Sequence, residues 1–223
     1  MVLSAKIFKI REEVDLITIS EKLKGFRKEE EIEEGKLITE IENLKLGTDY
    51  IEGLFSQDIP ITFYHREGEK TIIKTIEAPF LFQIYNDKIF LVILEKKRLA
   101  NNIANQLSKI LFINIGSIIE AEIPSETLRS FHEANPEDTK VIFFDNVDIP
   151  NIEKLSLYGS QLLNTNLYNE YLSHGNIWYI VFKSKKFGII VGITRDCVIT
   201  CFSKIEPKEF LNYIKEEVFP LIK

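Results

Sequence analysis

The sequence predicts an α+β fold in which antiparallel β-sheets pack against amphipathic helices. Short runs rich in β-branched and aromatic residues alternate with turn-like polar connectors, and short connectors join antiparallel neighbours. Two stretches with helical spacing of apolar residues, 97–112 and 207–222, each follow such runs. Hydrophobic residues make up 45% of the chain, including 16 Phe and 8 Tyr, which is enough for a sizeable core.

The closing segment 176–223 has the strongest pattern. Its runs at 177–182, 187–193 and 197–202 are apolar on both alternating sets of positions. Strands that are covered on both faces have this pattern, so we expect these runs in the middle of a sheet. Pro207 is suited to the first position of the following helix. The buried stripe expected for that helix comprises Phe210, Leu211, Ile214, Val218 and Leu221.

The first part of the chain has weaker signals. Residues 6–10 and 14–20 are expected to form a pair of strands. The acidic run over 29–34 is typical of a solvated helix face or a loop. Helical spacing then predicts a short helix that ends near Gly47, with an apolar stripe of Leu37, Ile38, Ile41 and Leu44.

From residue 48 onward the apolar period changes to two. Strands are expected at 50–56, 59–66, 70–77, 80–85 and 88–94, with turns near Asp58, Gly68, Pro79 and Asn86. A helix is expected over 97–112. The second half opens with 117–123, followed by a helix between Pro124 and Asn135, a strand at 140–145, a helix over 151–163 and a connector at 164–175.

The layout of strands followed by an amphipathic helix occurs twice, at 80–112 and at 177–222. This likeness predicts two similarly built α+β lobes, 1–115 and 116–223. A single continuous sheet shared by both halves is the alternative arrangement.

The net charge and the lengths of the apolar segments exclude some classes of function. A net charge of −6 and a pI of about 5.3 argue against indiscriminate binding of nucleic acid by the whole surface. No apolar run approaches the roughly 20 residues of a membrane-spanning helix, and residues 1–10 lack the apolar core of a signal peptide. We therefore expect a cytoplasmic protein with no membrane partner.

The two cysteines are expected to be small core residues. Cys197 and Cys201 fall in one predicted strand, where four strand steps separate them by roughly 13 Å. This separation is too long for an undistorted disulfide. No further Cys or His nearby completes a metal-binding pattern.

No catalytic constellation stands out, so we expect a protein that is not an enzyme and binds no cofactor or metal. Gly188 and Gly192 lie in a predicted strand, where the interpretation is close packing against a neighbouring backbone. Three histidines fall in separate elements, and His132 is interpreted as a surface residue. The competing hypothesis is a Mg²⁺-dependent hydrolase that uses Asp145 and Asp148, which leave a strand end.

Basic residues are distributed unevenly along the chain. Positive charges exceed negative ones over 95–110 and over 183–208, next to predicted turns of both lobes. Such residues can contact phosphates while nearby aromatic rings stack on bases, although solubilising turn lysines are the alternative. The candidate nucleic-acid-binding residues are Lys96, Lys97, Arg98, Lys183, Lys185, Lys186 and Arg195.

Large apolar residues also occur in the connector 164–175. Leu167, Tyr168, Tyr171 and Leu172 either form a patch that contacts another protein or dock on the core of this chain as one amphipathic turn.

The layout as a whole resembles the small non-catalytic partner proteins of short prokaryotic Argonautes, which supply the amino-terminal and linker regions. The resemblance is carried by the length, the strand-rich start, the hairpin–helix units at 80–112 and 177–222, and the ending KEEVFPLIK. It implies a heterodimer in prokaryotic defence, in which this subunit flanks a guide–target duplex and meets DNA or RNA through the complex. A structural interaction subunit without nucleic-acid contact is the alternative function.

Overall fold

The computed structural model describes residues 2–112, 116–135 and 138–223. The chain divides into two compact units, which we call the arm unit (Phe8–Ile119) and the C-terminal unit (residues up to Ile7 together with Glu120–Lys223). Helices and antiparallel strands in both units confirm the α+β fold class. The division into lobes 1–115 and 116–223 stays a prediction. None of the helices in the described ranges is long and apolar enough to cross a membrane.

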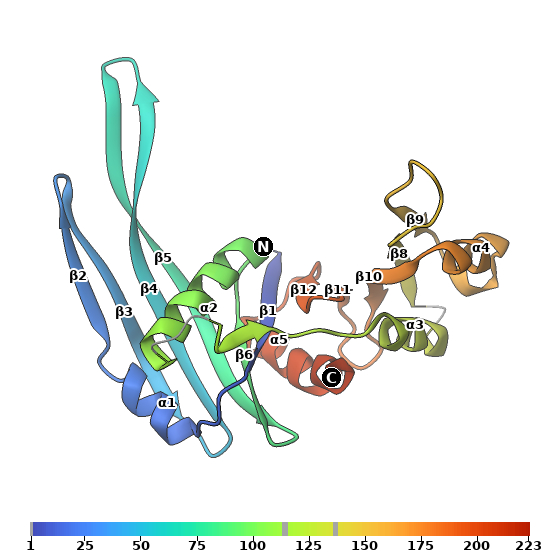
Figure 1. The fold of residues 1–223 in the computed structure, drawn as a ribbon, viewed down its shortest axis with the longest axis horizontal. Helices are drawn as coiled ribbons and strands as arrows, with labels where there is room; N and C mark the ends of the chain where they lie inside the picture. The colour runs from blue at the N-terminus through green and yellow to red at the C-terminus, as the bar shows by residue number, and fades with distance from the viewer. Residues whose placement is uncertain (1, 113–115, 136–137) are drawn as a thin grey trace. The chain divides into compact units, whose positions relative to one another are not determined.

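The sheet of the arm unit has the strand order β2-β3-β4-β5-β6, and all neighbours are antiparallel. The strands are β2 (Arg27–Ile32), β3 (Gly35–Leu46), β4 (Tyr50–His65), β5 (Gly68–Tyr85) and β6 (Lys88–Ile93). Two helices complete the unit, α1 (Leu16–Leu23) and α2 (Lys97–Phe112), as Figure 1 shows. The prediction of a helix over 97–112 is confirmed, and α2 buries Ile103, Leu107 and Leu111.

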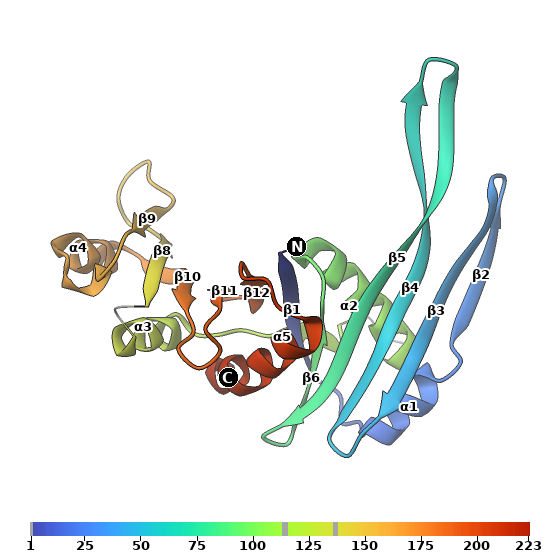
Figure 2. The ribbon, with the colours of Figure 1, turned by 180° about the vertical axis from the view of Figure 1, so that it is seen from behind.

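A long hairpin of β4 and β5 leaves this sheet. The two strands pair from Tyr50 and Gln83 to His65 and Gly68, but β3 pairs with β4 only as far as Gln57. The remaining part, 58–75, is a two-stranded ribbon that we call the arm (Figures 1 and 2). The predicted turns near Asp58 and Pro79 are therefore wrong. Both strands run through these positions, and Pro60 lies beyond the end of β3, where its missing N–H costs no pairing with that strand.

Two expectations for residues 14–46 are wrong, and a third is right in part. Residues 16–20 belong to the helix α1 and not to a strand, because Leu16, Ile19 and Leu23 lie on one buried helix face and Asp15 caps the helix. The Asp15 carboxylate accepts a hydrogen bond from the Thr18 N–H at 2.7 Å, which lowers the pKa of Asp15. The acidic run is solvated, as expected, but it forms the end of strand β2 and the turn that follows, and the expected helix after it is the strand β3. Arg27 bridges the hairpin by contacting Glu40, and Lys36 pairs with Glu29.

The sheet of the C-terminal unit has the strand order β1-β12-β11-β10-β8-β9, again antiparallel wherever a register is defined. The strands are β1 (Leu3–Ile10, which continues into the arm unit), β8 (Thr139–Asp145), β9 (Leu155–Tyr158), β10 (Asn176–Lys183), β11 (Ile190–Thr194) and β12 (Val198–Cys201). A short strand, β7 (Ile118–Glu120), pairs with β1. Because β8 and β11 flank β10, the prediction that 177–182 lies inside a sheet is confirmed.

Helices pack on one face of this sheet. They are α3 (Ser125–Ala134), α4 (Asn166–His174) and α5 (Pro207–Tyr213), the last extended by a π-helical turn (Ile214–Val218) and a 3-10 turn (Phe219–Leu221). Figures 1 and 2 show α3 and α5 on the same side of β10 and β11. Phe131 of α3 contacts Phe182, with ring centroids 4.7 Å apart, and Tyr171 of α4 contacts Phe144 at 5.8 Å.

The expected helix over 151–163 is also wrong. Leu155–Tyr158 pairs with β8 as the edge strand β9, and Gly159 follows at φ +158°, a backbone conformation that excludes a helix. Residues 164–175 contain α4, whose N-cap Thr165 accepts a hydrogen bond from the Tyr168 N–H at 3.2 Å. Tyr168 is buried, which supports docking on the core of the chain for that residue, whereas Leu167 is exposed.

Single-residue expectations have mixed outcomes. Cys197 and Cys201 are buried and form no disulfide, as predicted, although Cys197 lies just before β12 at φ 55°. His132 is fully buried against the ring of Tyr168, so the interpretation as a surface residue is wrong. Gly192 is closely packed, but against the side chain of Tyr179 and not against a backbone.

Candidate nucleic-acid interface

The start of α2 carries exposed cations. Lys96, Lys97 and Arg98 follow β6 directly, and all three side chains are exposed. The Lys96 N–H donates to the Glu95 carboxylate at 2.9 Å. Within the described ranges, no carboxylate pairs with the side chain of Lys96 or Arg98, and the first turn of α2 has no acidic residue. The helix dipole places positive potential at this end, so the site combines side-chain cations with a field that attracts anions.

Polar residues continue from these cations along one side of α2. Arg98, Asn102, Gln106 and Lys109 follow at helical spacing and lie partly or fully exposed. We call Lys96, Arg98, Asn102, Gln106 and Lys109 the α2 stripe. From Arg98 to Lys109 it extends roughly 16 Å along the helix axis. Sequence reasoning missed Asn102 and Gln106, although their spacing from Arg98 was a readable signal.

Two hollows border the α2 stripe. One of about 460 Å³ is lined by Glu95, Lys96, Arg98, Leu99 and Asn102. The other, of about 540 Å³, lies between α2 and the strands β2 to β4, and its lining includes Asn102, Gln106 and Lys109. Gln106 donates a hydrogen bond across this groove to the Gln57 side-chain oxygen at 2.9 Å. Glu30 and Asp58 also line it, so the groove has mixed charge while the start of α2 is cationic.

The second group of predicted cations has carboxylate neighbours. Lys185 and Lys186 lie in the turn between β10 and β11, not before a helix. The Lys185 ammonium lies 3.0 Å from Asp138, and Lys186 pairs with Glu216, whose hydrogen bond raises the pKa of Lys186. Together with Lys183 they line a pocket of about 380 Å³ that also contains Glu216 and Glu217. The positive charges of this segment, which exceed the negative ones along the sequence, therefore lie close to carboxylates in the folded chain.

Arg195 is held by a carboxylate as well. Its guanidinium donates to both oxygens of Asp145, at 3.1 and 2.8 Å, and to the Ser125 hydroxyl at 3.2 Å. About a third of the Arg195 side chain is exposed. A paired, two-pronged contact of this kind orients the arginine strongly. Arg195 therefore joins β8, α3 and the turn after β11.

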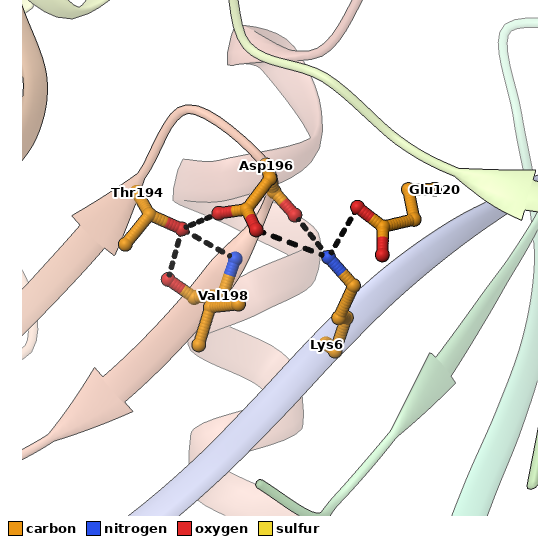
Figure 3. A network of polar contacts seen from close by, with 5 residues as sticks. All are labelled: Lys6, Glu120, Thr194, Asp196 and Val198. Atoms are coloured by element: carbon orange, nitrogen blue, oxygen red, sulfur yellow. Dashed lines mark hydrogen bonds and ion pairs between the residues drawn. The ribbon is translucent and has the colours of Figure 1, made fainter. Parts of the chain in front are cut away.

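A buried lysine that sequence reasoning missed also contacts this turn, at Asp196. Figure 3 shows the Lys6 ammonium between Asp196 and Glu120. It donates to the Asp196 carbonyl at 2.7 Å and lies 3.5 Å from the Asp196 carboxylate and 3.2 Å from Glu120. The Thr194 hydroxyl contacts the Asp196 carboxylate and accepts from the Val198 N–H at 2.9 Å. The only sequence signal was one lysine between Ala5 and Ile7 in an apolar strand.

The two aspartates of the hydrolase hypothesis have separate partners. Asp145 binds Arg195, whereas the Asp148 carboxylate lies 2.7 Å from His174 Nδ1. The Asp148 N–H also donates to the His174 carbonyl at 3.0 Å. In the described part of the chain, no three His, Cys, Asp or Glu side chains are grouped so that they could hold a metal ion. A Mg²⁺ site at Asp145 would have to displace Arg195.

Comparison with known proteins returned no protein-family model and no curated protein that matches this chain.

Proposed function

We propose that this chain is a non-catalytic subunit of a cytoplasmic complex that handles nucleic acid, and that the α2 stripe contacts phosphates. The observation that carries this proposal is the exposed pair Lys96 and Arg98 at the positive end of α2, whose side chains form no close ion pair with a carboxylate among the described residues, although Glu95 lies nearby. Cations at this end oppose the helix dipole, at a cost of about 0.3–1 kcal/mol each, so a bound anion would relieve an unfavourable arrangement.

Chemistry along the stripe suits a phosphate backbone. Lysine, arginine and side-chain amides make most of the sequence-independent contacts to phosphates, and the stripe supplies all three types. Because the whole chain has a net charge of −6, its own attraction for nucleic acid is expected to be weak. A more basic partner would supply most of the affinity.

The resemblance to partner proteins of short Argonautes makes a heterodimer with such a protein the specific form of this proposal. In it, the α2 stripe would lie along a guide–target duplex that the Argonaute holds. Co-purification of the tagged chain with an Argonaute subunit and bound DNA or RNA is the direct test of this form.

Salt dependence tests the contact residues themselves. We compare Lys96→Ala with Arg98→Ala against a control that loses the same charge, Lys185→Ala with Lys186→Ala. Each lost phosphate contact lowers the slope of log affinity against log salt by roughly 0.7–0.9, so the first double variant should flatten the slope by roughly 1.4–1.8. The control pair, already engaged by Asp138 and Glu216, should change it little. Equal effects of both pairs would show a general charge effect and contradict the proposal.

A structural interaction subunit is the second candidate, and the arm favours it. Phe63, Tyr64 and Ile72 are 40%, 88% and 51% exposed on this two-stranded ribbon. Isolated two-stranded ribbons are marginally stable in water, and exposed apolar groups on them favour coverage by another protein.

A further inference from the structure

The sheet of the C-terminal unit has a second face that the helices leave uncovered. Register places Phe143 beside Tyr179, and Val141 beside both Val181 and Tyr158, on the face opposite the helix-covered Phe144 and Phe182. Phe144 and Phe182 on the helix-covered face are buried, whereas on the opposite face Phe143 and Tyr179 are half-buried and Tyr158 is 67% exposed. We call this second surface the open face.

Four aromatic rings form a connected group there. Phe143 lies 5.8 Å from Tyr158, 6.0 Å from Trp178 and 5.5 Å from Tyr179, measured between ring centroids. Trp178 and Tyr179 are adjacent at a β-bulge in β10, where their rings lie 5.7 Å apart. Because of the bulge, the consecutive side chains of Trp178 and Tyr179 both contact Phe143.

A glycine positions one of the rings. A Cβ atom built on Gly192 would lie 2.3 Å from the Tyr179 hydroxyl oxygen and 2.8 Å from its ring. Tyr179 therefore lies across β11 in the space that a larger residue would occupy. Because the Tyr179 ring is already held in place on a strand, a ligand that binds to it would cause little loss of side-chain conformational entropy.

Cations and hydroxyl groups accompany the rings. The Lys154 ammonium lies 4.5 Å from the centroid of Trp178. Lys183, at the other end of β10, is exposed and its register partner is Ile190, itself 40% exposed. Ser156 pairs with Phe143 in register and is exposed. Of the nearby carboxylates, Asp145 is neutralised by Arg195, Glu153 lies next to Lys154 in the sequence, and Glu216 and Glu217 share a pocket with Lys183.

We infer that the open face binds single-stranded nucleic acid, with unpaired bases stacked on Tyr158 and the neighbouring rings and phosphates near Lys154 and Lys183. This inference rests on the proposed function and adds a second contact, for a strand that is not paired.

The combination of groups distinguishes this ligand from a protein. Base stacking on an aromatic side chain tolerates any base, and sheet surfaces that carry aromatic rings with lysines suit unpaired strands. Lysine is depleted from the cores of protein–protein interfaces, whereas Lys154 here lies directly over an aromatic ring. A duplex keeps its bases stacked on each other, so the rings would have nothing to stack on.

Trp178 supplies a direct readout, because it is the only tryptophan among the 223 residues. We titrate the full chain with an oligothymidine strand and with a duplex of the same length, and follow Trp178 fluorescence and affinity. The single strand should quench the fluorescence, and the duplex should not. Tyr158→Ala should weaken single-strand affinity about 5- to 150-fold, the range for one lost stacking contact. Tyr158→Phe keeps the ring and should retain the affinity.

Tyr64→Ala is the matched control, since it removes an even more exposed tyrosine from the arm and should change nothing. The inference is overturned if no single strand quenches Trp178, if Tyr158→Ala binds normally, or if Tyr64→Ala loses as much affinity. Loss of a protein partner in Tyr158→Ala without any single-strand binding would instead make the open face a protein interface. The double variant Lys96→Ala with Arg98→Ala separates the two proposals. If it binds duplex with the same salt slope as the wild type and its Trp178 is still quenched by the single strand, the α2 stripe is rejected and the open face is retained.

Discussion

Arg195 donates two hydrogen bonds to Asp145, a residue at the end of another strand, with N–O distances of 3.1 and 2.8 Å. This contact joins the turn after β11 to the end of β8 across β10. Arg195, a predicted nucleic-acid contact, and Asp145, a candidate metal ligand, are therefore paired with each other. The pair is consequently a structural element of the C-terminal unit.

Removing the carboxylate should therefore destabilise the fold. Asp145→Ala leaves a partly buried guanidinium without its two acceptors, and we expect a loss of about 1–2 kcal/mol in the free energy of unfolding. Asp148→Ala is the control, because that side chain is 70% exposed, and it should change stability by less than about 0.5 kcal/mol. Urea denaturation measures both, as a shift of midpoint at constant slope. Loss of a Mg²⁺-dependent hydrolysis in both variants at unchanged stability would support the hydrolase hypothesis instead.

Stability should fall in mild acid because of His132. Burial lowers the pKa of this imidazole below its ordinary value of 6.5, although Glu133 opposes the shift. Between the two pKa values the unfolded chain binds more protons than the folded one, so stability rises with pH across that window and is complete above about 6.5.

The thermal midpoint of the wild-type chain should therefore drop between pH 7.5 and 5, and His132→Phe should reduce that drop. Phenylalanine keeps an aromatic ring beside Tyr168 without a titrating group. His65→Phe is the control for the substitution itself, since it replaces a histidine that is exposed. An identical pH profile for His132→Phe and the wild type would contradict this assignment.

The arm should matter for association and not for folding. Phe63→Ser with Ile72→Ser changes side chains that are 40% and 51% exposed, so the free energy of unfolding should stay within about 0.5 kcal/mol. Capture of a partner by the tagged chain should be lost if the arm is the docking element. Ile17→Ser, which alters a residue on α1 that is 62% exposed, should retain the partner. Normal capture by the arm variant would remove the observation that favours the interaction-subunit candidate.

The sequence was sufficient to predict an element where a single segment showed both a clear apolar periodicity and clear end signals. The helix over 97–112 follows from its apolar stripe, and the interior position of 177–182 follows from two apolar faces. The α+β class follows from the same signals.

Pairing with distant segments decided the elements that the sequence predicted wrongly. The apolar residues of 37–44 fit a helix as well as a strand, and only pairing with β2 and β4 selects β3. Leu155 and Leu157 likewise become a strand because β8 offers an edge for pairing. Strand pairing depends on partners that are far away in the sequence, so periodicity within one segment cannot choose between the two.

Some candidate site residues could likewise be found from the sequence, whereas others were brought together only by the tertiary structure. The sequence alone identified the cations at 96–98, because their environment is set by neighbours in the chain and by the helix that they begin. Tertiary structure alone brought Glu216 to Lys186 and Asp145 to Arg195, and placed Phe143, Tyr158 and Trp178 together on one face. Electrostatic and stacking interactions act over a few ångströms of space, whatever the separation along the chain, so these groupings exist only once the sheet has formed.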